Sequence, residues 1–211
     1  MLGTQHLGVF VVAGLLLNIT PGPDTLYILG RTLSQGRAAG MVSVLGICTG
    51  CLVHTCAAAL GLSLILSESI LAFTVIKIAG AIYLIWLGIS AIRHKASAGS
   101  GPPPQFSAQD NFKIYRQAVI TNVLNPKVAL FFLAFLPQFI IATGGTRPIA
   151  FLFLGAIFVF NGMIYCFLLV FFASAIMRRL QRNPSGSAWM RRITGTVFIG
   201  LGLRLALEKR P

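Results

Sequence analysis

The stretch LNITPGPDTL, residues 17–26, interrupts a long apolar run and places an acid directly after the interruption. The run that precedes it, Leu7 to Leu17, contains no charged residue and has the character of a membrane-spanning helix. A proline inside a helix removes one backbone hydrogen bond and pushes away the carbonyl group four residues earlier. Pro21 and Pro23 therefore predict a broken helix in which the carbonyl groups of Leu17 and Ile19 lose their usual partners.

The composition predicts an integral membrane protein. Of the 211 residues, 56% are hydrophobic and 10% are charged, and the mean hydropathy is +0.84. A soluble domain has about 25% charged residues, so this chain lacks the charged surface that a soluble fold needs. The net charge of +13 lies in short clusters between apolar runs. This distribution indicates membrane topology, and we expect no nucleic-acid partner.

The apolar runs predict six membrane spans and a division into two halves. About 20 residues of apolar helix cross a bilayer, and the candidate spans are residues 6–29, 38–66, 70–92, 114–141, 148–176 and 189–207. A polar stretch rich in Pro, Gly and Ser follows the third span and predicts a flexible linker. We therefore expect a first three-helix unit at residues 1–92, a linker at 93–113 and a second three-helix unit at 114–211.

Positive charges predict the orientation of these spans. Cytoplasmic loops carry an excess of Lys and Arg, and eleven of these residues fall in the first, third and fifth loops: Arg31, Arg37, Arg93, Lys95, Lys113, Arg116, Arg178, Arg179, Arg182, Arg191 and Arg192. The other side holds Arg147, Lys209 and Arg210, with Arg204 near the end of the last span. We therefore expect these three loops in the cytoplasm and both termini on the outer side of the membrane.

The two halves share a motif. NITPGPD at residues 18–24 and TNVLNPK at residues 121–127 each place an asparagine and a proline break in the first helix of a half. Because three spans precede the linker, the second half starts on the opposite side of the membrane, as in transporters built from inverted repeats. The predicted fold is all-α, with six transmembrane helices in two inverted three-helix repeats, whose first and fourth helices are broken.

Opposite charges follow the two breaks. Asp24 comes directly after Pro23, and Lys127 directly after Pro126, which frees the carbonyl group of Asn122. A charge at the centre of a bilayer costs roughly 2.5–3.5 kcal/mol on the insertion scale, so such groups mark functional sites by default. A zwitterion fits this pattern, with its ammonium group on Asp24 and its carboxylate on Lys127 or on backbone N–H groups. A structural ion pair between Asp24 and Lys127 is the alternative interpretation.

Several stretches resemble the LysE/RhtB family of bacterial amino-acid exporters. They are NITPGPDTLYIL, the GxxTG pattern at Gly46–Gly50, IKIAGAIYLIWLGISAIR and TNVLNPKVALFFLAFLPQF. The resemblance covers essentially the whole chain and implies a six-helix exporter of the bacterial inner membrane, so the outward-facing termini expected from the positive charges would lie in the periplasm. It also implies export of amino acids such as homoserine, threonine, leucine or lysine, driven by the proton gradient. The candidate substrate-binding residues on the family's patterned positions are Asn18, Pro21, Gly22, Pro23, Asp24, Lys77, Asn122, Asn125, Pro126 and Lys127.

A second interpretation concerns the motif CTGCLVH. Cys48, Cys51 and His54 share one sector of a helix, which would suit a divalent metal-ion exporter, although zinc needs a fourth ligand. We expect no bound metal and no cofactor, and we take metal export as the alternative function. His54, near the middle of its span, is instead a candidate for proton coupling together with Asp24.

The motifs that the chain lacks limit its function further. No GxxxxGK[ST] phosphate loop appears, so ATP cannot drive transport within this chain, and no HExxH or GxSxG motif suggests an enzyme. We therefore predict a secondary exporter that exchanges protons for amino acids, with Asp24 holding either a proton or the substrate ammonium group. The expected partners are the amino acid, protons and the lipid bilayer. The GxxxG pairs suit close helix packing or a homodimer.

Overall fold

The structure is a computed structural model that describes residues 3–62, 70–93, 107–141, 147–182 and 184–207. These residues form helices and short connections, with one isolated backbone bridge between Thr4 and Ile140. A π-helical turn, Ala58–Leu62, extends α3, while a π-helical turn and a 3₁₀ turn, Phe131–Phe135 and Leu136–Phe139, extend α7. The α-helices are α1 (Leu7–Ile19), α2 (Pro23–Gln35), α3 (Arg37–Ala57), α5 (Ile70–Arg93), α6 (Asn111–Val123), α7 (Pro126–Leu130), α8 (Arg147–Arg182) and α9 (Pro184–Leu207).

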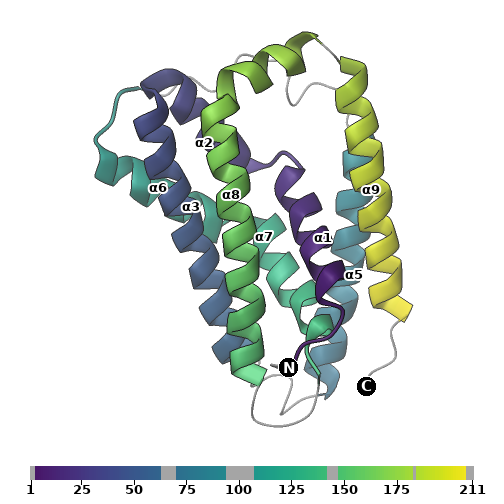
Figure 1. The fold of residues 1–211 in the computed structure, drawn as a ribbon. Coiled ribbons are helices and arrows are strands. Elements are labelled where there is room, and N and C mark those ends of the chain that lie inside the picture. The colour runs from purple at the N-terminus through teal and green to yellow at the C-terminus, as the bar shows by residue number, and fades with distance from the viewer. Residues whose placement is uncertain (1–2, 63–69, 94–106, 142–146, 183, 208–211) are drawn as a thin grey trace.

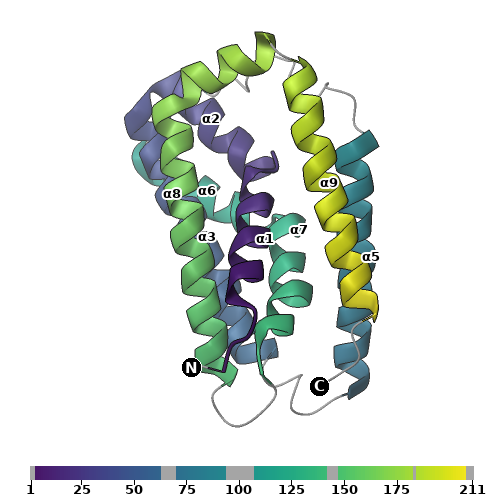
Figure 2. The same cartoon turned by 45° about the vertical axis from the view of Figure 1, so that its right-hand side comes forward.

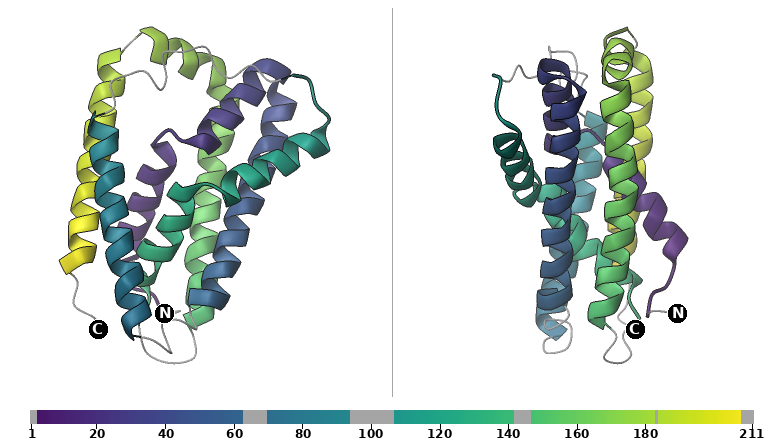
Figure 3. Two further views of the ribbon diagram at one scale, coloured as in Figure 1. Left: turned by 180° about the vertical axis from the view of Figure 1, so that it is seen from behind. Right: turned by 60° about the vertical axis from the view of Figure 1, so that its left-hand side comes forward.

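The helices run back and forth along one long axis (Figure 1). α1 begins and α9 ends at the same end of the bundle, whereas α2 meets α3 at the opposite end, where α8 also passes into α9 (Figures 1 and 3). The pair α1–α2 runs toward the end where α2 meets α3, whereas the pair α6–α7 runs away from that end (Figure 3). The two pairs thus cross the bundle in opposite directions.

Both helix breaks fall at the proline motifs. α1 and α2 are bent by 52° relative to each other, and the helices on either side of the second break are bent by 46°. Pro23 and Pro126 each occupy the first turn of the helix that follows the break, where the missing N–H group would have no helical partner in any case. The prolines therefore end one helix and start the next within a few residues.

Two continuous helices in the described part of the chain, Arg37–Gly61 and Arg147–Ala175, are long and apolar enough to cross a membrane, and the number rises to four if each bent pair counts as one span. The predicted six spans would also require α5 and α9, which are 24 residues long each. The predicted span at residues 6–29 ends later than expected, because α2 continues to Gln35.

Close backbone contacts between helices depend on glycine. A Cβ atom at Gly46 of α3 would lie 2.5 Å from the Tyr115 carbonyl oxygen of α6, and a Cβ atom at Gly88 of α5 would lie 2.5 Å from the Gly195 carbonyl oxygen of α9. α5 and α9 run side by side as a pair at one edge of the bundle (Figure 2). The predicted GxxxG packing of Gly46 and Gly50 is thus used within the chain, against α6, to position the second broken helix.

We predict that Gly195→Ala destabilises the protein, whereas Gly200→Ala on the same helix is tolerated. The added methyl group at Gly195 would lie 2.6 Å from the Gly88 carbonyl oxygen, but no atom lies within 4 Å of a Cβ atom at Gly200. Overpacking of this kind costs about 1–3 kcal/mol, so the melting temperature of purified Gly195→Ala in detergent should fall clearly below that of Gly200→Ala. Equal melting temperatures would show that the two backbones do not touch.

Candidate functional site

Basic side chains meet the carbonyl groups that the prolines release. The Leu17 carbonyl oxygen, four residues before Pro21, accepts a hydrogen bond of 2.9 Å from Lys127 Nζ, which also donates to the Thr20 carbonyl oxygen at 2.8 Å. An unpaired backbone group in hydrocarbon costs several kcal/mol. The amine that follows the second break thus satisfies the backbone of the first.

The second break has a matching contact. His54 Nε2 lies 3.2 Å from the carbonyl oxygen of Asn122, four residues before Pro126, and the ring donates to it when Nε2 carries a proton. The same carbonyl oxygen also accepts from the backbone N–H of Asn125 at 2.9 Å. The His54 ring stacks on Phe132, with ring centroids 5.8 Å apart. His54 therefore supports the second broken helix from α3.

Lys127 is held at the junction of the two halves. Its backbone N–H donates to the side-chain oxygen of Asn125, which caps α7, at 3.0 Å. Its ammonium group lies at the C-terminal end of α1, where the helix dipole favours a cation. A Cβ atom at Gly22 would lie 3.2 Å from Lys127 Nζ, so the glycine leaves room for the ammonium group.

Asp24 lies in the first turn of α2, where the helix dipole favours a carboxylate. Its Oδ2 accepts a hydrogen bond from Asn122 Nδ2 at 2.9 Å, whereas its Oδ1 is buried and makes no hydrogen bond. Asp24 forms no direct ion pair with Lys127, whose ammonium group contacts the two carbonyl oxygens instead. The alternative of a structural Asp24–Lys127 pair therefore does not describe this conformation.

Unpartnered polar atoms gather around the two breaks. Within the described part of the chain, the buried side-chain atoms without a hydrogen bond are Asn18 Nδ2, Asp24 Oδ1, Asn122 Oδ1 and Asn125 Nδ2. More than about 90% of buried polar groups in proteins are paired. Two donors and two acceptors left free on the residues that flank the two breaks are therefore typical of a region that receives polar groups from water or from a ligand.

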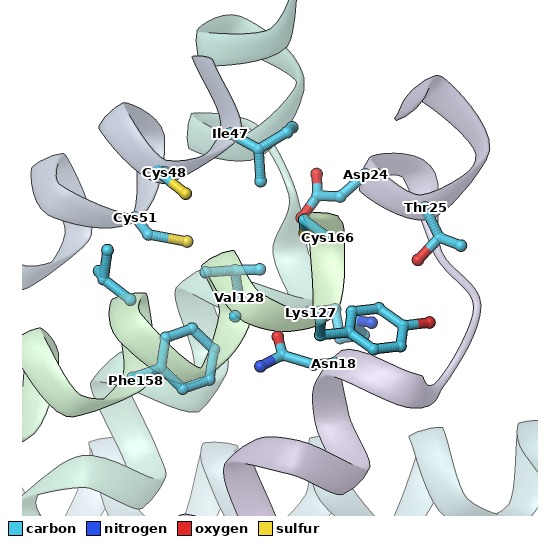
Figure 4. Close-up of a pocket in the computed structure, with 13 residues that line it drawn as sticks. Asn18, Asp24, Thr25, Ile47, Cys48, Cys51, Lys127, Val128, Phe158 and Cys166 are labelled. Carbon is cyan, nitrogen blue, oxygen red and sulfur yellow. The ribbon is translucent and has the colours of Figure 1, made fainter. Parts of the chain in front are cut away.

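A small cavity of about 30 Å³ lies between the two breaks (Figure 4). It can hold about two water molecules, so an amino acid would enter only if the surrounding helices moved apart. The lining residues come from α1, α2, α3, α7 and α8, that is from both halves: Asn18, Asp24, Thr25, Ile47, Cys48, Cys51, Lys127, Val128, Phe158, Val159, Gly162, Tyr165 and Cys166.

The structure sorts the sequence-predicted residues into three groups. Asn18, Asp24 and Lys127 line the cavity, whereas Asn122 and Asn125 are buried beside it and orient Asp24 and Lys127 through hydrogen bonds. Pro21, Pro23 and Pro126 are exposed and act through the backbone, and Gly22 packs on Lys127. Lys77 belongs to α5, but its side chain lies outside the described part of the structure.

Cys48, Cys51 and His54 do not come together as metal ligands in this conformation. Cys48 and Cys51 line the cavity, but His54 points to Asn122. No group of three or more His, Cys, Asp or Glu side chains in the described ranges is placed to hold a metal ion. The metal-export interpretation therefore finds no ligand set here.

The sequence motifs did not single out four of the five residues that α8 contributes to the cavity, the fifth being Tyr165. Phe158, Val159, Gly162 and Cys166 line the cavity from that helix, although no charge or break marks them. One signal was available: Gly162 lies against Asn18, and Gly50 of α3 lies against Asn122. Each asparagine before a break is thus faced by a glycine of another helix.

Arg31 differs from its predicted role as a loop charge. It lies within α2 and is 1% exposed. Its guanidinium group donates to neutral acceptors: Gln35 Oε1 at 2.6 Å, Gln109 Oε1 at 2.7 Å, Gln117 Oε1 at 2.8 Å and the Ser107 carbonyl oxygen at 3.1 Å. The residue therefore ties α2 to α6 and to the segment before it, and only Arg37 remains as a charge of the first connection.

We predict that Lys127→Met destabilises the folded protein, because the Leu17 and Thr20 carbonyl oxygens would both lose their donor. A buried acceptor left unpaired costs about 1–3 kcal/mol. Lys113→Met is the matched control, since Lys113 is exposed on α6 and pairs only with Asp110 in the described structure. Thermal unfolding in detergent should separate the two variants, and identical transitions would contradict the role of Lys127 as a backbone partner.

Comparison with known proteins identifies the family of this chain. The family model described as "LysE type translocator" matches residues 15–209. An uncharacterized membrane protein of Vibrio cholerae is 31% identical over 200 residues, covering 95% of this chain and 96% of the relative. The uncharacterized membrane protein YrhP of Bacillus subtilis is 28% identical over 211 residues, which cover 94% of this chain and 97% of the relative.

A leucine efflux protein of an Enterobacter species is 26% identical over 208 residues, which cover 97% of this chain and 96% of the relative. No solved structure matches the chain. Since the family match extends over nearly the whole length and includes both proline breaks, the chain belongs to the LysE type translocator family and is a multi-pass membrane protein.

Proposed function

We propose that this protein is a secondary exporter of amino acids that binds its substrate in the cavity between the two broken helices. The observation that carries the proposal is that one carboxylate and one amine, Asp24 and Lys127, line the same buried cavity without pairing with each other. The family match and the printed name of the Enterobacter leucine efflux protein support the class of substrate.

The free polar atoms suggest how an amino acid is held. Its ammonium group would bind the free acceptor, Asp24 Oδ1, and its carboxylate would bind Asn18 Nδ2 and Lys127. The Lys127 ammonium group has three N–H donors, of which two contact the carbonyl oxygens of α1. One donor therefore remains for the substrate without exposing the backbone.

The same geometry supports coupling to protons. A protonated Asp24 is neutral and no longer attracts an ammonium group, so a proton and a substrate exclude each other at this side chain. The halves would then rock around the site between two orientations. Inward movement of protons would drive outward movement of the amino acid.

Several features support the inverted repeat that alternating access requires. Asp24 and Lys127 each follow the proline that starts a half-helix. α3 packs against α6 and α7, and α8 packs against α1 and α2, so that a helix of each half contacts the broken helix of the other half. We therefore retain six spans, divided into residues 1–92, 93–113 and 114–211, in the bacterial inner membrane with both termini in the periplasm.

Asp24→Asn should reduce export to background while the protein level in the membrane is unchanged, because an amide can neither exchange a proton nor attract an ammonium group. Asp110→Asn is the control, since Asp110 is an exposed cap of α6 and asparagine caps a helix equally well. The measurement is efflux of a panel of labelled amino acids from expressing cells, with and without an uncoupler. Normal export by Asp24→Asn would rule out the coupling role.

His54→Gln tests whether His54 carries protons as proposed or only supports Asn122. In liposomes with a trapped pH indicator, we expect substrate exchange to continue, while the proton flux that accompanies net efflux falls severalfold. Phe132→Leu removes only the stacked ring and should leave the proton flux per substrate unchanged. A wild-type ratio of protons to substrate in His54→Gln would assign the residue a structural role.

A further inference from the structure

We infer that the end of α1 is a binding site for a primary ammonium ion, and that the side chain of Lys127 is its built-in occupant. Lys127 comes from the second half of the chain, so it is a positioning residue that holds α1 by its charge as well as by its hydrogen bonds. This role concerns the fold itself and is independent of the proposed export.

The carbonyl oxygens at the end of α1 form the site. Thr20 donates both its backbone N–H and its hydroxyl group to the Leu16 carbonyl oxygen, at 3.1 and 2.7 Å. The Leu17 carbonyl would normally accept from the residue four positions later, but that residue is Pro21 and has no N–H group. The Leu17 and Thr20 carbonyl oxygens instead accept from Lys127 Nζ, at 2.9 and 2.8 Å.

The surroundings of this ammonium group require a positive charge. The C-terminal end of a helix carries the equivalent of about half a negative elementary charge, and Asp24 lines the same cavity as Lys127. Lys127 is 9% exposed, so water and salt screen these charges little. Among the described residues that line the cavity, Lys127 is the one cation. Its removal would leave a buried carboxylate and a helix end without a positive charge, which is strongly unfavourable.

The contacts suit an ammonium ion in particular. Both have the length of N–H···O hydrogen bonds, and a primary ammonium group places three donors on one charged atom. In transporters with discontinuous helices, the carbonyl ends of half-helices coordinate dissolved sodium ions or protons. In this protein a covalently attached group occupies the equivalent place at the end of α1, so this break needs no ion from solution.

Gly22 and the adjoining cavity give room for a free ion when the lysine side chain is shortened. A Cβ atom at Gly22 would lie 3.2 Å from Nζ and 3.5 Å from Cε of Lys127. Lys127→Ala removes the propylammonium portion of the side chain, and the space that it vacates joins the cavity that Lys127 lines. We therefore expect free propylammonium to enter this space and to donate to the Leu17 and Thr20 carbonyl oxygens.

Thermal unfolding of purified Lys127→Ala in detergent tests the inference. The variant should unfold at a lower temperature than the wild-type protein, and propylammonium chloride should restore at least half of that loss in a saturable manner. Tetramethylammonium has the charge but no N–H donor, and propionamide has N–H donors but no charge. At equal ionic strength, neither compound should restore the melting temperature.

Lys127→Met is the matched control, because its neutral side chain fills the space that propylammonium would occupy. Propylammonium should leave the melting temperature of Lys127→Met unchanged. The same result is expected for the wild-type protein and for Lys113→Ala, whose lysine lies exposed on α6.

A second measurement applies if Lys127→Ala is too unstable to purify. The same compounds are then compared in detergent extracts of expressing cells, where propylammonium alone should recover a monodisperse peak in size-exclusion chromatography. No stabilisation of Lys127→Ala by propylammonium in both measurements would overturn the inference, as would equal stabilisation by propionamide or an equal effect on Lys127→Met. Neither measurement involves transport, so a failure of the proposed function would appear separately, as a lack of amino-acid efflux.

Discussion

A backbone carbonyl group that loses its helical partner within a membrane must find another donor, and this requirement organises the whole centre of the protein. The prolines release the carbonyl groups of Leu17 and Asn122. Lys127 reaches across from the second half to the first of these, and His54 reaches from α3 to the second. Each half thus depends on side chains outside its own broken helix, so the two breaks are held together.

The same requirement explains why charged groups are tolerated between apolar helices. Lys127 lies where the C-terminal end of α1 presents its carbonyl groups, and Asp24 lies where α2 begins. Both positions are favoured by the helix dipole. Because Lys127 is occupied by the backbone, Asp24 keeps an unpaired oxygen atom beside the cavity. This oxygen atom is the one to which the proposed function assigns a proton or the ammonium group of the substrate.

Close packing sets the distances on which these contacts depend. Gly46 and Gly50 bring α3 against α6, and Gly162 brings α8 against Asn18. The α2–α6 contact is then fixed by Asp24 with Asn122 and by the hydrogen bonds of Arg31 to Gln117 and Gln109. This polar contact between the halves joins the cavity to the end of the bundle where α2 ends, and it would have to separate if the halves rock.

The sequence by itself determined the apolar helical character of the chain, the positions of both breaks and the first-turn placement of Asp24 and Lys127, because prolines and apolar runs act locally along the backbone. Only the tertiary structure decided which groups meet: that Lys127 binds carbonyl groups rather than Asp24, that His54 lies against Asn122, that Arg31 is buried, and that α8 contributes to the cavity lining. Helical periodicity defines the faces of a helix but not the neighbour that each face meets, and in a chain that is apolar on nearly every face that choice depends on packing.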